Sequence, residues 1–171
     1  MGRIVTVKKV EAERQKAVQY IKSSILYPSV FLGLLSIILG YGALIYLLFS
    51  GRHLAQIVVD SFILLGFGLL LGWFQSLYHR FLLEHYPEYY AERRRKSEQV
   101  RAGRFRKFGV VPKPVHRGRW LIPYLYWVAF IGFIALAVYY SMRLNAMAAI
   151  FLPLAGFYNL RFFFWKRKLH L

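Results

Sequence analysis

A run of 25 residues without a charged side chain, residues 25–49, most constrains what this chain can fold into. At about 1.5 Å of rise per residue, a helix of that length exceeds the roughly 30 Å hydrocarbon core of a bilayer. Three further apolar runs carry at most one charged residue each: 54–78, 120–140 and 146–165. The sequence therefore predicts an all-α integral membrane protein, with four transmembrane helices in two hairpins joined by a basic cytoplasmic segment.

Positive charge lies between these apolar runs. The formal net charge is +17 although 58% of the residues are hydrophobic. Half of the 24 Lys and Arg residues fall in residues 79–119, whereas only Arg52 and Arg143 fall in the predicted outer turns. Because Lys and Arg accumulate in cytoplasmic loops, we expect a multi-pass protein of the cell (inner) membrane with both termini in the cytoplasm.

The predicted organisation follows from these two patterns. Residues 1–24 form a cytoplasmic segment, either an amphipathic helix on the membrane surface or a helix packed on the protein. Residues 25–78 form the first transmembrane hairpin, and residues 79–119 form the basic loop with a surface helix. Residues 120–165 form the second hairpin, and residues 166–171 form a basic cytoplasmic C-terminus.

Small residues mark candidate helix contacts. Gly68 and Gly72 form a small-xxx-small pair in the second run, and Gly40 lies in the first. Such spacing lets two helices approach closely in a membrane, although glycine is also common in membrane helices for no specific reason. Pro153 lies near the middle of the fourth run, where we expect it to kink the helix or leave a carbonyl without its helical partner.

Asp60 is the one acidic residue in the four runs. A buried aspartate would be a candidate proton or cation site. The sequence favours a plainer interpretation, an aspartate at the outer interface that lies in water or pairs with Arg52. No second carboxylate occurs in a run, so the pair that acid–base catalysis commonly uses is missing.

No motif indicates a metal or a cofactor, and we expect neither. The chain contains no cysteine. His79 and His85 are six residues apart, which does not place two ligands on one helix face. We therefore assign no catalytic residue from the sequence.

Basic side chains of the middle segment are candidate contacts for anionic lipids or for a protein partner. Each Lys or Arg near an anionic membrane contributes about 1 kcal/mol. The alternative is that these charges only hold the loop in the cytoplasm, and nucleic acid is not an expected partner. The candidate residues are Arg93, Arg94, Arg95, Lys96, Arg104, Arg106 and Lys107.

Three functions follow from these features. The first is a small non-catalytic accessory, scaffold or regulatory protein, which acts through helix packing with other membrane subunits or with itself and through its basic loop. The second is a small homo-oligomeric transporter or channel that uses Asp60, Pro153 and Asn159. The third is a membrane-bound enzyme acting on lipid or another anionic substrate at the cytoplasmic face through His79 and nearby residues, among them His85 and Glu88.

Overall fold

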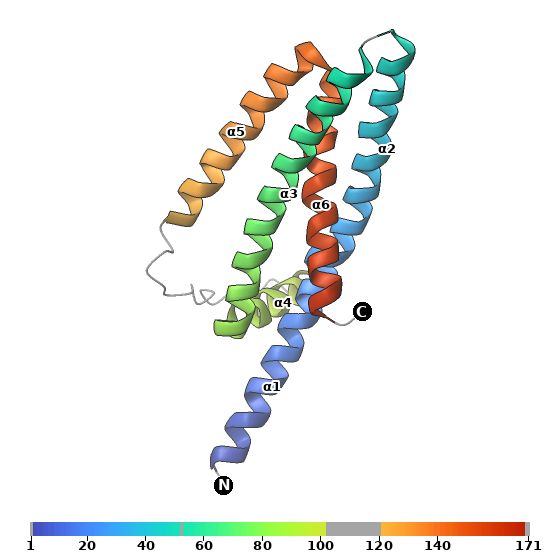
Figure 1. Cartoon of the computed structure of the whole chain (residues 1–171). Coiled ribbons are helices and arrows are strands. Elements are labelled where there is room, and N and C mark those ends of the chain that lie inside the picture. The colour runs from blue at the N-terminus through green and yellow to red at the C-terminus, as the bar shows by residue number, and fades with distance from the viewer. Residues whose placement is uncertain (1, 52, 102–120, 170–171) are drawn as a thin grey trace. The chain divides into compact units, whose positions relative to one another are not determined.

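The computed structural model describes residues 2–51, 53–101 and 121–169, with side chains for residues 11–51, 53–100 and 121–169. These residues form helices and short turns, with no strand among them (Figure 1). The elements are α1 (Gly2–Ile21), the π-helical turn η1 (Lys22–Leu26), α2 (Tyr27–Phe49), α3 (Leu54–His85), α4 (Pro87–Arg101), α5 (Leu121–Arg143) and α6 (Ala146–Lys168). Four helices are long and apolar enough to cross a membrane, so the all-helical prediction with four such helices is confirmed.

Several helices extend beyond the predicted apolar runs. The first run does not start a helix, because α1, η1 and α2 follow one another without a break from Gly2 to Phe49. Likewise α3 continues to His85, and α6 continues to Lys168. Apolar composition shows which part of a helix is suited to lipid. The backbone hydrogen bonds of a helix form through polar residues as readily as through apolar ones, so a helix can extend past the end of its apolar run.

The widened turn η1 has a local cause in Pro28. Proline lacks an N–H group and its ring clashes with the carbonyl four residues earlier, here that of Ser24. In the turn that precedes Pro28, the Tyr27 N–H donates to the Lys22 carbonyl, five residues earlier, instead of to the residue four earlier as in an α-helix. A π-type turn is a recognised way to insert such a residue into a continuous helix. The Ser23 hydroxyl supports this turn by donating to the Gln19 carbonyl at 3.1 Å.

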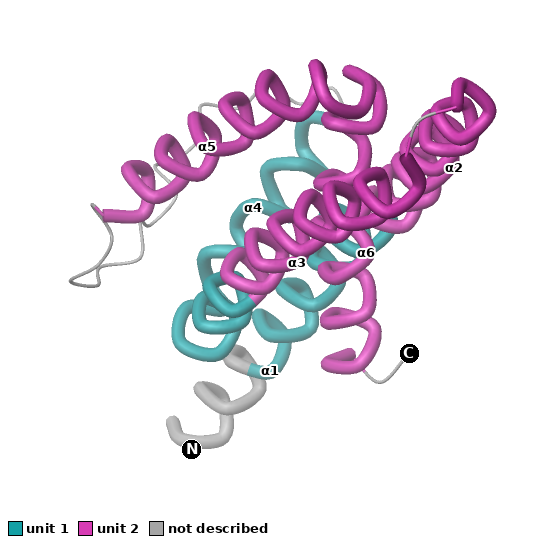
Figure 2. Tube along the Cα trace, turned by 45° about the horizontal axis from the view of Figure 1, so that its top comes forward, with its two compact units in different colours: residues 1–27, 77–116 teal, residues 28–76, 117–171 magenta. Residues whose placement is uncertain are grey.

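The chain divides into two compact units, coloured separately in Figure 2. Unit 1 contains residues 1–27 and 77–116, and unit 2 contains residues 28–76 and 117–171. The helix α3 continues from one unit into the other.

In unit 1, α1 packs against α4. Ala17 and Ile21 of α1 are fully buried, and Tyr90 and Ala91 of α4 are 1% exposed. The Tyr20 and Tyr90 rings lie with their centroids 5.8 Å apart. Leu82 and Leu83, near the end of α3, are also buried and belong to the same unit.

In unit 2, α6 lies between α2 and α3, with α5 on the side of α3 away from α2 (Figure 1). The buried face of α2 carries small residues at helical spacing, including Ser29, Gly33, Ser36 and Gly40. An apolar cluster joins all four helices and contains Leu44, Leu47, Ile57, Leu64, Tyr140, Leu144, Ala148, Ala149 and Leu152.

Candidate functional site

The tightest helix contact in unit 2 involves the two glycines of the predicted pair. A Cβ atom added at Gly68 would overlap the Pro153 carbonyl oxygen, and one added at Gly72 would lie 2.7 Å from the Phe157 carbonyl oxygen. On the opposing helix, a Cβ at Gly156 would lie 2.5 Å from the Leu65 carbonyl oxygen. Backbone therefore meets backbone between α3 and α6, which only glycine permits.

The contact between α2 and α6 is looser. A Cβ at Gly40 would meet the Leu152 side chain at 3.2 Å, and one at Gly33 would meet Asn159 Oδ1 at 3.2 Å. The Asn159 amide donates to the Ala155 carbonyl at 2.8 Å. Asn159 is therefore used in helix packing and in a hydrogen bond to its own helix.

Pro153 lies inside α6, as its position in the fourth run indicates. Because proline has no N–H, the Ala149 carbonyl cannot receive its usual bond from residue 153. Ala149 is fully buried in the apolar cluster. The carbonyl oxygen of the same proline lies against Gly68. The turn of α6 that lacks a backbone hydrogen bond is therefore also the place where α3 comes closest.

Asp60 is buried, so the interpretation as an aspartate in water is wrong. It is 4% exposed, and Oδ2 has no hydrogen-bond partner among the described residues. Asp60 shares a helix face with Ile57 and Leu64, which belong to the apolar cluster. Arg52, the expected partner, lies outside the described residues. Sequence position alone missed this burial, because it depends on which face of α3 meets the other helices.

The histidines of unit 1 do not converge on one site. Nδ1 of His79 lies 2.6 Å from the Tyr90 hydroxyl, and Nδ1 of His85 lies 3.1 Å from the Phe81 carbonyl oxygen. Within the described residues no group of three or more His, Cys, Asp or Glu side chains could hold a metal ion. Glu88 is exposed in the first turn of α4.

The basic residues of α4 differ in their surroundings. Arg94 pairs with Glu98 at 2.7 Å, and the Arg93 guanidinium lies 4.8 Å from the centre of the Tyr89 ring. Arg93 and Arg95 are exposed, whereas Arg94 and Lys96 are half-buried. The other three candidates, Arg104, Arg106 and Lys107, lie outside the described residues.

The helix α5 is the least covered of the four apolar helices. Its most apolar 18 residues include none that is buried, whereas the corresponding stretches of the other three are 28%, 28% and 33% buried. Its exposed side chains are large: Val128 is 68% exposed, Leu125 65% and Trp127 64%. Only Tyr140, near the end of α5, is buried.

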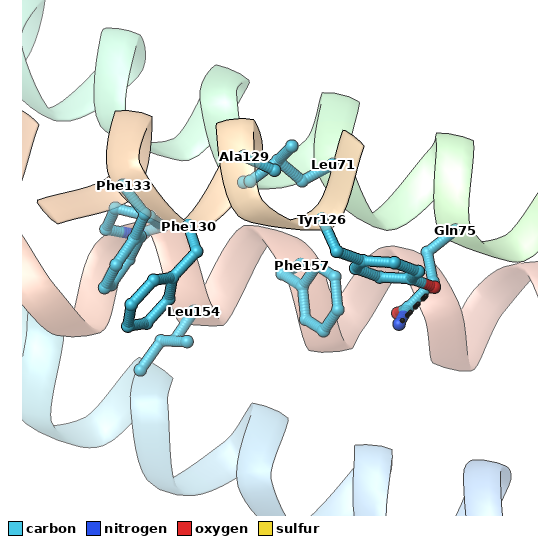
Figure 3. A pocket seen from close by; sticks show the side chains of 10 residues that line it. Leu71, Gln75, Tyr126, Ala129, Phe130, Phe133, Leu154 and Phe157 are labelled. Carbon is cyan, nitrogen blue, oxygen red and sulfur yellow. Dashed lines mark hydrogen bonds between the residues drawn. The ribbon is translucent and has the colours of Figure 1, made fainter. Parts of the chain in front are cut away.

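A groove of about 340 Å³ lies between α3, α5 and α6 (Figure 3). Its walls are almost entirely apolar, and Gly68 and Pro153 are among the residues that line it. At one end the Gln75 amide donates to the Tyr126 hydroxyl at 3.3 Å. Sequence reasoning did not find this groove, because its residues come from three helices and form no pattern along the chain.

The arrangement offers packing surfaces, a buried carboxyl and an apolar groove, and within the described residues it brings no acid–base pair together. In comparisons with family models, curated proteins and solved structures, none matches this chain.

Proposed function

We propose that this protein is a non-catalytic, multi-pass membrane protein that acts as an accessory, scaffold or regulatory subunit by packing α5 against a helix of another membrane subunit. The observation that carries the proposal is the absence of buried residues from the apolar stretch of α5. The other three apolar helices cover one another around α6, and α5 leaves its large side chains outside that arrangement.

The composition of the α5 surface supports a protein partner. Aromatic and β-branched side chains, including Trp127, Val128, Ile131 and Val138, are each more than half exposed there. Helices associate in membranes through van der Waals packing, and large rigid side chains make many such contacts.

The charge distribution supports the expected orientation, in the cell (inner) membrane with both termini in the cytoplasm. In that orientation Arg93 and Arg95 of α4 lie in the cytoplasm, where their exposed guanidinium groups attract anionic headgroups or an acidic protein surface. Arg94 contributes less, because it already pairs with Glu98.

The test combines isolation with site-specific crosslinking. A photoreactive amino acid replaces Val128 on α5, and the matched control replaces Phe31 on α2; both residues are 68% exposed. After irradiation of native membranes, we expect a defined protein adduct from position 128 and none from position 31. A chain that elutes as a monomer in mild detergent, with no adduct from position 128, contradicts the proposal.

A second function is favoured by Asp60. A buried carboxyl with an unpartnered oxygen in an apolar helix is a typical feature of proton and cation pathways. In this second function the chain would act as a homo-oligomer, with the path between its copies. Proton or cation uptake into liposomes, lost in Asp60→Asn, supports transport, and equal uptake in both variants removes the support of Asp60.

A further inference from the structure

We infer that the groove between α3, α5 and α6 is a binding site for one acyl chain of an ester-linked bilayer lipid, and that the Tyr126 hydroxyl donates a hydrogen bond to the ester carbonyl. This inference does not rest on the proposed accessory function. It concerns the inner wall of α5, whereas that function concerns the exposed outer surface of the helix.

The volume and lining of the groove suit a single acyl chain. Leu71 and Ala129 line it from α3 and α5, and Phe130, Leu154 and Phe157 provide further apolar walls (Figure 3). A volume of about 340 Å³ lies at the lower end of the range for small-molecule pockets.

The polar end of the groove has hydrogen-bonding capacity left over. Gln75 donates to the oxygen of the Tyr126 hydroxyl, so the hydroxyl hydrogen remains for an acceptor. Gln75 Oε1 is buried as well and has no hydrogen-bond partner among the described residues, but it is itself an acceptor, so the ester carbonyl is matched to the Tyr126 hydroxyl and not to this oxygen. An ester carbonyl is an acceptor of the required kind, and its acyl chain would follow the apolar walls away from Tyr126.

The position of Tyr126 also fits a lipid ester. It lies five residues after Leu121, the first residue of α5, so it is roughly 7–8 Å along the helix from that end. Water is a poor alternative occupant, because apolar cavities of this kind stay dry. The three lining helices are apolar enough to cross a membrane, so lipid chains surround the mouth of the groove in a bilayer.

The experiment measures lipid binding to the full-length chain by native mass spectrometry. The probes are palmitoyl-oleoyl-phosphatidylcholine and its dialkyl ether analogue, which lacks ester carbonyls. We expect one ester lipid to be retained per chain. Tyr126→Phe should weaken ester-lipid binding roughly fivefold, the effect of one hydrogen bond, and should leave binding of the ether lipid unchanged.

A matched pair of variants tests the groove itself. Ala129→Trp fills it and should weaken binding of both lipids about tenfold or more, because apolar contact is lost. Ala135→Trp adds the same bulk at an exposed position of α5 outside the groove and should bind both lipids as the unmodified chain does. Tyr126→Phe hardly changes side-chain volume, so its ester-to-ether comparison remains decisive if Ala129→Trp fails to fold.

An equal effect of Tyr126→Phe on the ester and the ether lipid contradicts the hydrogen bond, and three further results overturn the inference. The first is that the unmodified chain retains no lipid. The second is that Ala129→Trp and Ala135→Trp bind lipid equally. The third is a lipid-free dimer, which would show that a side chain of a second copy fills the groove.

Discussion

Gly68 of α3 lies directly against the backbone carbonyl of Pro153 in α6, at a distance that leaves no space for a Cβ atom. The contact joins a residue without a side chain to the one residue in α6 whose nitrogen carries no hydrogen. Gly72 and Gly156 extend the contact along the two helices. This pair of helices is therefore the most closely packed part of unit 2, and it forms one side of the groove beside α5.

Replacement of Gly68 should destabilise the protein more than replacement of its neighbour Gly66. Gly68→Ala forces backbone apart from backbone, and overpacking of this kind costs roughly 1–3 kcal/mol. Gly66 has no atom within 4 Å of the position of an added Cβ. Unfolding by SDS in mixed micelles should show the loss for Gly68→Ala and none for Gly66→Ala. Equal stability of the two variants contradicts the observed contact.

Gly40→Ala should be tolerated better than Gly68→Ala. The added Cβ meets the end of the flexible Leu152 side chain at 3.2 Å, and that side chain is able to move by a few tenths of an ångström. We expect a change in the free energy of unfolding within about 0.5–1 kcal/mol, since alanine also favours the helix. The same SDS titration compares the two variants, and a loss as large as that of Gly68→Ala would show that α2 and α6 are packed as rigidly as α3 and α6.

Asp60→Leu should leave stability unchanged or raise it. The carboxyl is buried beside apolar residues and one of its oxygens has no hydrogen-bond partner among the described residues, so the change removes an unsatisfied polar group. Leaving such a group buried costs about 1–3 kcal/mol. Ser61→Ala is the control, because the Ser61 hydroxyl donates to the Ile57 carbonyl at 2.6 Å and its removal gains nothing comparable. A large loss of stability in Asp60→Leu would show that the carboxyl has a partner in the folded protein.

Tyr90→Phe should weaken unit 1. The change removes the hydrogen bond between the Tyr90 hydroxyl and His79 and keeps the ring that packs against Tyr20. The expected loss is about 0.5–1.5 kcal/mol. Tyr89→Phe is the matched control on α4. The Arg93 guanidinium contacts the face of the Tyr89 ring, and a phenylalanine ring keeps that contact. Hydrogen exchange of the α1 and α4 amides should increase for Tyr90→Phe only.

One substitution on α5 and one on α6 should separate the stability of the protein from its association with a partner. Val128→Ala removes an exposed side chain and should change the free energy of unfolding by less than about 0.5 kcal/mol. Leu152→Ala removes a fully buried side chain of the cluster and should cost roughly 2 kcal/mol, mainly through the cavity it leaves. Recovery of a co-isolated subunit, measured from the same membranes, should fall for Val128→Ala. A destabilised Val128→Ala variant would mean that α5 is packed inside the protein.

The apolar runs predicted the four long apolar helices because length and composition are local properties of the chain. The same runs misplaced several helix ends, since α1 enters α2 through η1 and α6 continues through Arg167. Gly68 and Gly72 could be named from their spacing. Their opposing residues could not, because the register between α3 and α6 depends on side chains from both helices.

The sequence by itself determined that the chain is helical, that four of its helices suit a bilayer, and that positive charge is concentrated between the apolar runs and at the ends of the chain. These are properties of composition and order along the chain. Tertiary structure decided that Asp60 is buried, that α5 is left uncovered, and that Gln75 and Tyr126 meet at the end of an apolar groove. The physical reason is that burial and cavities depend on which faces of separate helices meet. A helix that is apolar on all sides has no polar face, so its sequence does not indicate which of its faces will be buried.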